Sequence, residues 1–186
     1  MRRGFTYVEL LVSVGVIGLL VALVLPAIAR ARGAAQSTRC LAQLRQISSG
    51  FLQYAADHDK RLPDPFVLQT SWEQLLHAYL GNDEVFRCVG DGELFQTIGS
   101  SFDWRDTGRA DTTLAGKLVT DSSRGDCVLA FEALPGWHEK GRMNAALLNG
   151  AASSMDQDAC MGDLQTSIRA DASEAARAAK RRTAPR

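Results

Sequence analysis

The sequence is poor in aromatic residues and carries no excess of charge of either sign. Of its 186 residues, 7% are Phe, Trp or Tyr, and 21 Lys and Arg balance 21 Asp and Glu. A net charge of zero disfavours a strongly basic nucleic-acid-binding protein and a highly charged disordered chain. We therefore expect no nucleic-acid partner. The length fits one small domain with an additional segment.

Motifs that usually indicate catalysis or cofactor binding are missing from the chain. It has no Gly-x-Ser-x-Gly, no Gly-x-Gly-x-x-Gly, no phosphate-binding loop and no Cys-x-x-Cys. The spacings between its four cysteines fit no zinc template. Among the three histidines, His138 follows a tryptophan, and we interpret it as a loop or sheet-edge residue. The sequence predicts no enzymatic activity.

One long apolar run is the most informative feature that is present. Residues 10–29 include no charged residue, and twenty residues are what a helix needs to cross a hydrocarbon core about 30 Å thick. Arginines stand on both sides of the run, so charge does not decide its orientation. The very short N-terminal flank favours a cytoplasmic N-terminus and an extracytoplasmic remainder.

Three roles are open for this run: a cleaved signal peptide, an ordinary membrane anchor, or an anchor that also assembles with its neighbours. The triplet Ala27-Ile28-Ala29 fits signal cleavage. Glu9 argues against that role, because a carboxylate costs about 2.5–3.5 kcal/mol at the bilayer centre and less near the interface. A segment that is removed has no use for such a residue.

Residues 2–12, with the sequence Arg-Arg-Gly-Phe-Thr-Tyr-Val-Glu-Leu-Leu-Val, resemble the cleavage and methylation motif of type IV pilins and type II secretion pseudopilins. The resemblance implies a leader peptide of residues 1–4, cut between Gly4 and Phe5 by a prepilin peptidase. Phe5 then becomes the N-methylated first residue and Glu9 the fifth. Pro26 stands where these subunits commonly carry a helix-bending proline.

The same resemblance implies a function, a location and partners. The chain would be a single-pass inner-membrane protein with a periplasmic head, assembled into a type II secretion-type pseudopilus. Its partners would be copies of itself, other pseudopilins, the assembly platform and the lipid bilayer. A true type IV pilus subunit, or a tethered or secreted binding module, remains an alternative.

Several residues within the apolar run or just before it are suited to assembly. The Glu9 carboxylate of one subunit can neutralise the Phe5 amine of the next, which satisfies both charges in a medium of low dielectric constant. Gly15 and Gly18 would let neighbouring helices approach closely. Pro26 lacks a backbone N–H and should bend or loosen the helix before it.

The helical pattern continues beyond the apolar run. Apolar residues recur every three or four positions from Leu41 to Ala55, which predicts that one helix runs from residue 5 to about residue 58. We divide this helix into a membrane segment, 5–29, and an amphipathic continuation, 30–60. Prolines at 63 and 65 end it.

Residues 61–165 are predicted to form an α+β head, in which the helix packs on a small antiparallel sheet. We expect a helix over 72–81, little regular structure over 86–126, and strands over 127–131, 142–148 and 151–155. Asn149-Gly150 predicts a type I′ hairpin turn. The basic, alanine-rich tail, 166–186, is expected to be a frayed helix or a flexible terminus.

The head also resembles a pseudopilin subgroup, similar to general secretion pathway protein G, with a late His and an Asp-Gly turn. The matching residues are Cys40 with 44–47 (Leu-Arg-Gln-Ile), Leu62-Pro63, 79–81 (Tyr-Leu-Gly) with 86–88 (Phe-Arg-Cys), and His138 ahead of Asn149-Gly150. The chain departs from the subgroup where Asn149 replaces Asp, where the gap after His138 is one residue longer, and where Val89 replaces Pro.

The cysteines of an extracytoplasmic head can form disulfides, and their even number leaves three full pairings open. We expect Cys160 to pair with Cys127 or Cys88, and Cys40 to be a buried free thiol.

Asp156, Asp158 and Asp163 form the one candidate cofactor site, for calcium, which prefers oxygen ligands. Major pseudopilins carry a calcium site in a late loop, and the resemblance implies the same place here. No other cofactor is expected.

Overall fold

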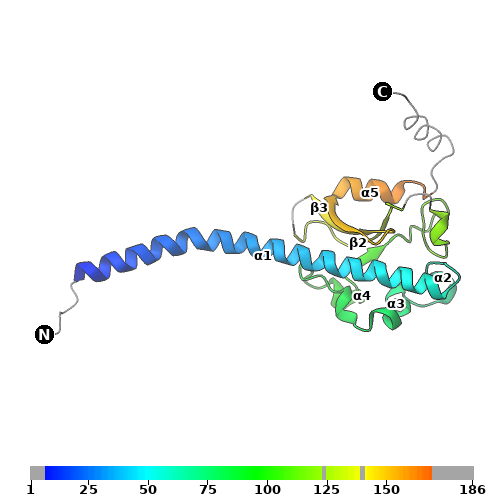
Figure 1. Ribbon diagram of the computed structural model, residues 1–186, viewed down its shortest axis with the longest axis horizontal. Coiled ribbons are helices and arrows are strands. Elements are labelled where there is room, and N and C mark those ends of the chain that lie inside the picture. Colours follow the sequence, from blue (N-terminus) through cyan, green and yellow to red (C-terminus); the bar gives the residue numbers. More distant parts are fainter. Residues whose placement is uncertain (1–6, 123–124, 139–140, 169–186) are drawn as a thin grey trace, which may run out of the picture. The chain divides into compact units, whose positions relative to one another are not determined.

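The computed structural model describes residues 7–122, 125–138 and 141–168, so the predicted leader, Gly4, Phe5 and most of the tail lie outside the described residues (Figure 1). The elements in chain order are α1 (Tyr7–Asp57), α2 (Pro65–Leu68), α3 (Trp72–Leu80), the 3-10 turn η1 (Asp83–Phe86), α4 (Leu94–Ile98), β1 (Phe102–Trp104), the 3-10 turn η2 (Val119–Asp121), β2 (Val128–Glu132), β3 (Arg142–Leu147), β4 (Ala152–Asp156) and α5 (Gln157–Gln165). The predicted α+β class is confirmed. The chain divides into two compact units, one ending at Gln36 and the head beginning at Ser37.

Helix α1 runs without interruption from Tyr7 to Asp57, as the periodicity predicts, and Pro26 lies inside it. Its buried residues begin only at Cys40, where the amphipathic stripe enters the head. The helix ends because Asp59 and Lys60 adopt positive φ angles, 51° and 61°, which reverse the chain before the two prolines.

Helix α3 confirms the second predicted helix, and its ends follow the sequence signals. The Ser71 side chain accepts a hydrogen bond from the Gln74 backbone N–H, which satisfies one free donor of the first turn. Gly81 ends the helix with a φ of 66°, a conformation that glycine adopts without steric cost.

The sheet has the strand order β1-β2-β3-β4, and every neighbouring pair is antiparallel. The three strands predicted from the sequence are β2, β3 and β4, whereas β1 was not predicted. Trp104 lies opposite Ala130, and Phe131 lies opposite Ala145. The register of β2 shifts between Val128 and Ala130, which interrupts the alternation of its side chains between the two faces of the sheet.

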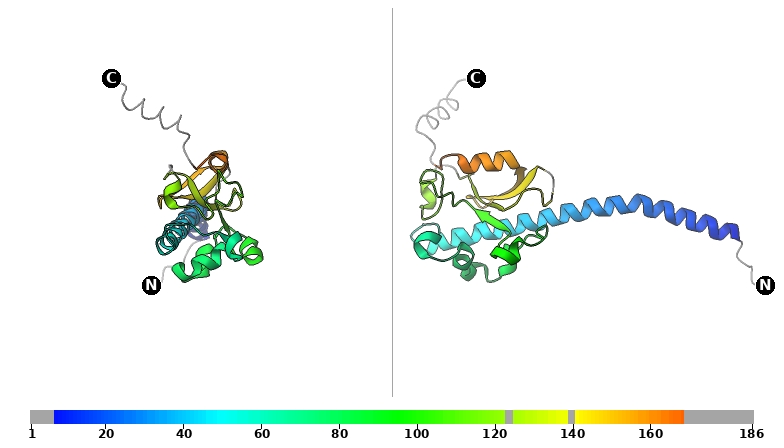
Figure 2. Two further views of the ribbon diagram at one scale, coloured as in Figure 1. Left: turned by 90° about the vertical axis from the view of Figure 1, so that its right-hand side faces the viewer. Right: turned by 180° about the vertical axis from the view of Figure 1, so that it is seen from behind.

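Both faces of the sheet are covered. One face packs on the second half of α1, with the segment from α2 to α4 on the far side of that helix, and α5 covers the other face (Figures 1 and 2). The larger core lies on the α1 side and contains Leu44, Ile47 and Phe51. A smaller core lies beneath α5 and contains Phe131 and Met143.

Residues 86–126 contain little regular structure, as predicted, although three short elements lie within them. This segment contains α4, β1 and η2, which are too short to give a periodic signal. Asp91 organises it, because its carboxylate accepts hydrogen bonds from the backbone N–H groups of Leu94 and Phe95 and from the Ser101 hydroxyl. Burial alone would raise the pKa of Asp91, but these hydrogen bonds bring it below its usual value.

The hairpin lies where Asn149-Gly150 predicts it, but its turn is not type I′. A type I′ turn needs positive φ at two successive residues, and here only Gly150, at 87°, has one. The Gly150 N–H donates to the Leu147 carbonyl, which closes a turn over residues 147–150. The hairpin is therefore of the three-residue type, in which glycine forms a bulge.

A buried arginine joins the end of β1 to α5 and to the start of the predicted tail. The Arg105 side chain is fully buried, and its NH1 group lies 2.6 Å from Asp163 Oδ2. The same guanidinium donates to the backbone carbonyls of Thr112 and Thr166. Ile168 is 3% exposed, so the ordered head extends past the predicted boundary at residue 165.

Replacement of Arg105 by alanine should lower the free energy of unfolding by about 3–5 kcal/mol, because it leaves the largely buried Asp163 carboxylate without its cation. Urea unfolding followed by circular dichroism measures the change. Arg109→Ala is the matched control, since Arg109 and its partner Asp111 are both exposed. Equal effects of the two substitutions would contradict the assigned role of Arg105.

Candidate functional site

The first candidate site is the apolar surface of α1. An 18-residue window of this helix has a mean hydropathy of 2.7, and none of it is buried within the chain. The helix is long and apolar enough to cross a membrane. Its large apolar side chains between Tyr7 and Ile28 are 45–78% exposed.

The described residues predicted to serve assembly, Glu9, Gly15, Gly18 and Pro26, all lie on this surface. Glu9 is in the first turn of α1, and its carbonyl accepts a hydrogen bond of 2.7 Å from the Ser13 hydroxyl. A Cβ atom added at Gly15 or Gly18 would meet no described atom within 4 Å. The two glycines are therefore not required by packing within the chain.

The second candidate site begins with a disulfide that joins α1 to the segment after η1. Cys40 pairs with Cys88, and their Cα atoms are 5.5 Å apart. The expectation that Cys40 is a free thiol was wrong, and so was the pairing of Cys160 with Cys127 or Cys88. Cys127 and Cys160 are both buried and lie outside this disulfide.

The position of each cysteine explains the observed pairing. Cys160 belongs to the small core beneath α5, whereas Cys88 belongs to the core on the α1 side of the sheet, so the sheet separates them. Cys40 stands one helical turn before Leu44 on the apolar stripe of α1. That spacing is a sequence signal that places Cys40 in the head core.

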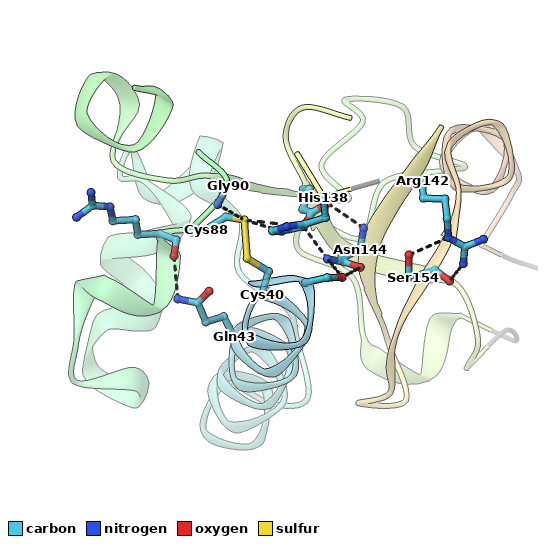
Figure 3. A network of polar contacts seen from close by, with 11 residues as sticks. Cys40, Gln43, Cys88, Gly90, His138, Arg142, Asn144 and Ser154 are labelled. Atoms are coloured by element: carbon cyan, nitrogen blue, oxygen red, sulfur yellow. Dashed lines mark hydrogen bonds and ion pairs between the residues drawn. A yellow bond between two sulfur atoms is a disulfide. The ribbon is translucent and has the colours of Figure 1, made fainter. Parts of the chain in front are cut away.

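His138 lies directly beside the disulfide (Figure 3), and the carboxylate of Glu132 lies next to both. His138 Nε2 is 3.2 Å from Cys88 Sγ and 3.2 Å from Glu132 Oε1. Cys88 Sγ is 3.9 Å from the same Glu132 oxygen. The His138 side chain is 6% exposed and that of Glu132 is 1% exposed, so the cluster is closed to solvent.

Two neighbouring strands hold the carboxylate in place. Glu132 is the last residue of β2, and Asn144 lies on β3. The backbone N–H of Asn144 donates to Glu132 Oε2 at 3.0 Å, and its side-chain amide donates to Oε1 at 2.8 Å. Asn144 is itself contacted by Ser37 of α1. Both oxygens of Glu132 are therefore oriented by one neighbouring residue.

The loop from β2 to β3 brings His138 against Cys88. A Cβ atom added at Gly90 would come within 2.8 Å of Trp137 Cβ, so glycine permits this close approach. The Gly90 backbone N–H also donates to Cys88 Sγ at 3.4 Å. A larger residue at this position would push the loop, and His138 with it, away from the sulfur.

Burial shifts both titratable groups of the cluster toward their neutral forms. Burial raises the pKa of Glu132, and the hydrogen bonds from Asn144 offset only part of that effect. Burial lowers the pKa of His138. The Nδ1 atom of His138 has no hydrogen-bond partner among the described residues.

The cluster has the ligand types of a metal site. Four potential ligand atoms lie within 4.8 Å of one another: the sulfur atoms of Cys40 and Cys88, a carboxylate oxygen of Glu132 and a ring nitrogen of His138. Sulfur, imidazole nitrogen and carboxylate oxygen are the ligands that zinc prefers. The burial of all four side chains favours a structural role over contact with a substrate.

Sequence reasoning missed this site. His138 lies in a loop, as the sequence predicts, but its side chain is buried inside the head, and no sequence motif indicates Glu132. The available signal was a charged residue that directly follows the apolar strand segment 127–131. Such a residue is either exposed or held by specific partners, and only the fold distinguishes these cases.

The candidate calcium residues do not form a shared site in the described part of the chain. Asp156 caps the N-terminus of α5, and its carboxylate accepts a hydrogen bond from the backbone N–H of Asp158. Asp163 instead binds the Arg105 guanidinium and the Val128 N–H. Asp158 and Asp163 lie in a helix rather than a loop, and the carboxylates of Asp156 and Asp163 bind different neighbours.

Comparison with family models, curated proteins and solved structures finds no match for the chain.

The disulfide and the two buried thiols predict a simple reactivity pattern. In the native state, neither Cys127 nor Cys160 should react rapidly with Ellman's reagent, because both are buried and burial raises the pKa of Cys160 to about 11. After denaturation two thiols per chain should react, and after denaturation with reduction all four should. A rapidly reacting thiol in the native chain would contradict the assignment.

Proposed function

We propose that the chain is a pilin-like structural subunit that is processed by a prepilin peptidase and assembles through α1 into a type II secretion-type pseudopilus. The observation that carries the proposal is the bare apolar surface of α1, with a carboxylate, Glu9, in its first turn. The proposed location is the inner membrane, with the head in the periplasm.

The apolar surface is too large for the chain to leave in water. Burying one large apolar side chain contributes about 1.5–3 kcal/mol, and those between Tyr7 and Ile28 are each 45–78% exposed. Their sum exceeds the roughly 5–15 kcal/mol that stabilises a whole domain. A lipid bilayer before assembly, and neighbouring helices after it, would remove this surface from water.

Glu9 distinguishes an assembling helix from a simple anchor. A bilayer span gains nothing from a carboxylate in its apolar segment. A stack of such helices gains a fixed register, because the carboxylate of one subunit can neutralise the Phe5 amine of the next. The open surfaces around Gly15 and Gly18 would allow close helix packing in the same stack.

The buried cluster agrees with a structural role for the head. Its four side chains are nearly inaccessible to solvent. A tethered or secreted binding module is distinguished by the experiments below, whereas a true type IV pilus subunit would be processed and assembled in the same way.

Processing gives the first test. Intact-mass and N-terminal peptide analysis of protein purified from host membranes should find a mature chain that begins at N-methylated Phe5. A Gly4→Leu variant should retain Met1, because the peptidase would lose its cleavage site. A native chain that begins near Arg30 would instead indicate signal cleavage and a secreted module, and an unprocessed native chain would indicate a simple anchor.

Assembly gives the second test. In a reconstituted system, Glu9→Ala should reduce filament formation at least about a hundredfold, since a buried pair that loses one partner costs about 3–5 kcal/mol. Filaments are counted by electron microscopy, and an intact Cys40–Cys88 disulfide shows that the head still folds. Ser13→Ala, one turn further along α1, is the matched control. Assembly of Glu9→Ala at the wild-type level would favour the tethered module.

A further inference from the structure

We propose that the reduced head binds one zinc ion through Cys40, Cys88, Glu132 and His138, as an alternative to the Cys40–Cys88 disulfide. The four ligand atoms already lie within 4.8 Å of one another. This inference does not depend on the proposed function, because it concerns only the interior of the head.

The spacing of the ligand atoms fits tetrahedral zinc. With zinc–sulfur bonds of about 2.3 Å and zinc–nitrogen or zinc–oxygen bonds of about 2.0–2.1 Å, ligand atoms lie about 3.3–3.8 Å apart. The three separations among Cys88 Sγ, His138 Nε2 and Glu132 Oε1 are 3.2, 3.2 and 3.9 Å. One triangular face of the coordination tetrahedron is therefore already formed.

The fourth ligand, Cys40, decides between the two states. The sulfur atoms of a disulfide are about 2.05 Å apart, whereas two thiolates on one zinc ion are about 3.8 Å apart. The disulfide and the metal therefore exclude each other. The Cα separation of 5.5 Å between Cys40 and Cys88 requires only that the sulfur atoms move apart.

The exchange between the two states balances with a dithiol as reductant. The dithiol supplies two electrons and two protons, which break the Cys40–Cys88 bond and form two thiols, and the dithiol itself becomes a cyclic disulfide. Zinc then binds the two thiolates, and the two thiol protons are released to solvent.

The surroundings of the cluster provide the support that metal ligands need. Asn144 donates one hydrogen bond to each oxygen of Glu132, and Oε1 keeps a further lone pair for the ion. The two thiolates and the carboxylate bring three negative charges, of which zinc neutralises two. The Asn144 donors stabilise the one negative charge that remains. Loss of such a residue, which hydrogen-bonds to a metal ligand, typically lowers metal affinity by about 10–100-fold.

The metal would link the two segments that the disulfide joins and two further segments of the head. Cys40 lies on α1, Cys88 follows η1, Glu132 ends β2 and His138 lies in the β2–β3 loop. The disulfide joins only the first two of these segments, whereas a zinc ion would join all four. A reduced head would thus retain a cross-link between α1 and the rest of its core.

The test uses the full chain in detergent micelles, reduced with dithiothreitol and freed of it by anaerobic gel filtration. Competition with a chromophoric chelator should show one tightly bound zinc ion per reduced chain and none per oxidised chain. Cobalt, added as a spectroscopic probe, should give a thiolate charge-transfer band and the visible bands of a tetrahedral site.

Variants locate the site within the reduced chain. His138→Gln and Glu132→Gln keep both cysteines and should weaken zinc binding by more than about tenfold. Loss of a residue that only supports a metal ligand already lowers metal affinity by about 10–100-fold, and loss of a ligand should cost more. Cys160→Ser and His77→Gln are the matched controls, because Cys160 lies beneath α5 and His77 is largely exposed. Both controls should bind zinc like the wild type.

X-ray absorption of the wild-type zinc complex keeps the proposal testable if the ligand variants do not fold. Two sulfur and two nitrogen or oxygen neighbours are expected. The proposal is overturned if the reduced wild type binds no stoichiometric zinc, if its zinc has a different sulfur count, or if folded His138→Gln binds as tightly as the wild type. Filament assembly plays no part in these measurements, so their failure leaves the proposed function untouched.

Discussion

The burial of one stripe of α1 determines how the head is built. Phe51, in the last third of that stripe, stacks on Trp72 of α3 at 5.6 Å between ring centroids and on Trp104 of β1 at 4.8 Å. A single side chain thereby joins the sheet to the segment on the other side of the helix. The head of roughly 130 described residues relies on this contact layer because α1 is the one long element that reaches both sides.

Polar side chains of α1 fix the register of the surrounding chain. Gln43 donates to the backbone carbonyls of Glu84 and Arg87 at 2.9 and 2.8 Å, which positions the segment that carries Cys88. On the other side, Ser48 donates to the Leu147 carbonyl at 3.1 Å, next to the hairpin. Hydrogen bonds as well as apolar contacts therefore position the chain segments on both sides of α1.

Local signals were sufficient for the long or strongly patterned elements and insufficient for the rest. The period from Leu41 to Ala55 indicates α1, and the serine cap with the terminal Gly81 indicates α3. Strand β1 has three residues, and its partners follow about thirty residues later, so no local pattern encodes it. The cluster could not be predicted for the same reason, because Cys40, Cys88 and Glu132 are far apart in the sequence and meet only in the folded chain.

The position of the cluster along α1 explains why a cross-link is useful there. Cys40 is the first buried residue of the helix, and it lies just inside the start of the head unit at Ser37. Packing of a helix opens most easily from the end where burial begins, since few contacts must break. A disulfide or a metal at this end prevents that opening, whereas the same link near Phe51 would reinforce a region that aromatic stacking already holds. The chain thus combines a covalent link where the burial of α1 begins with aromatic stacking further along the helix.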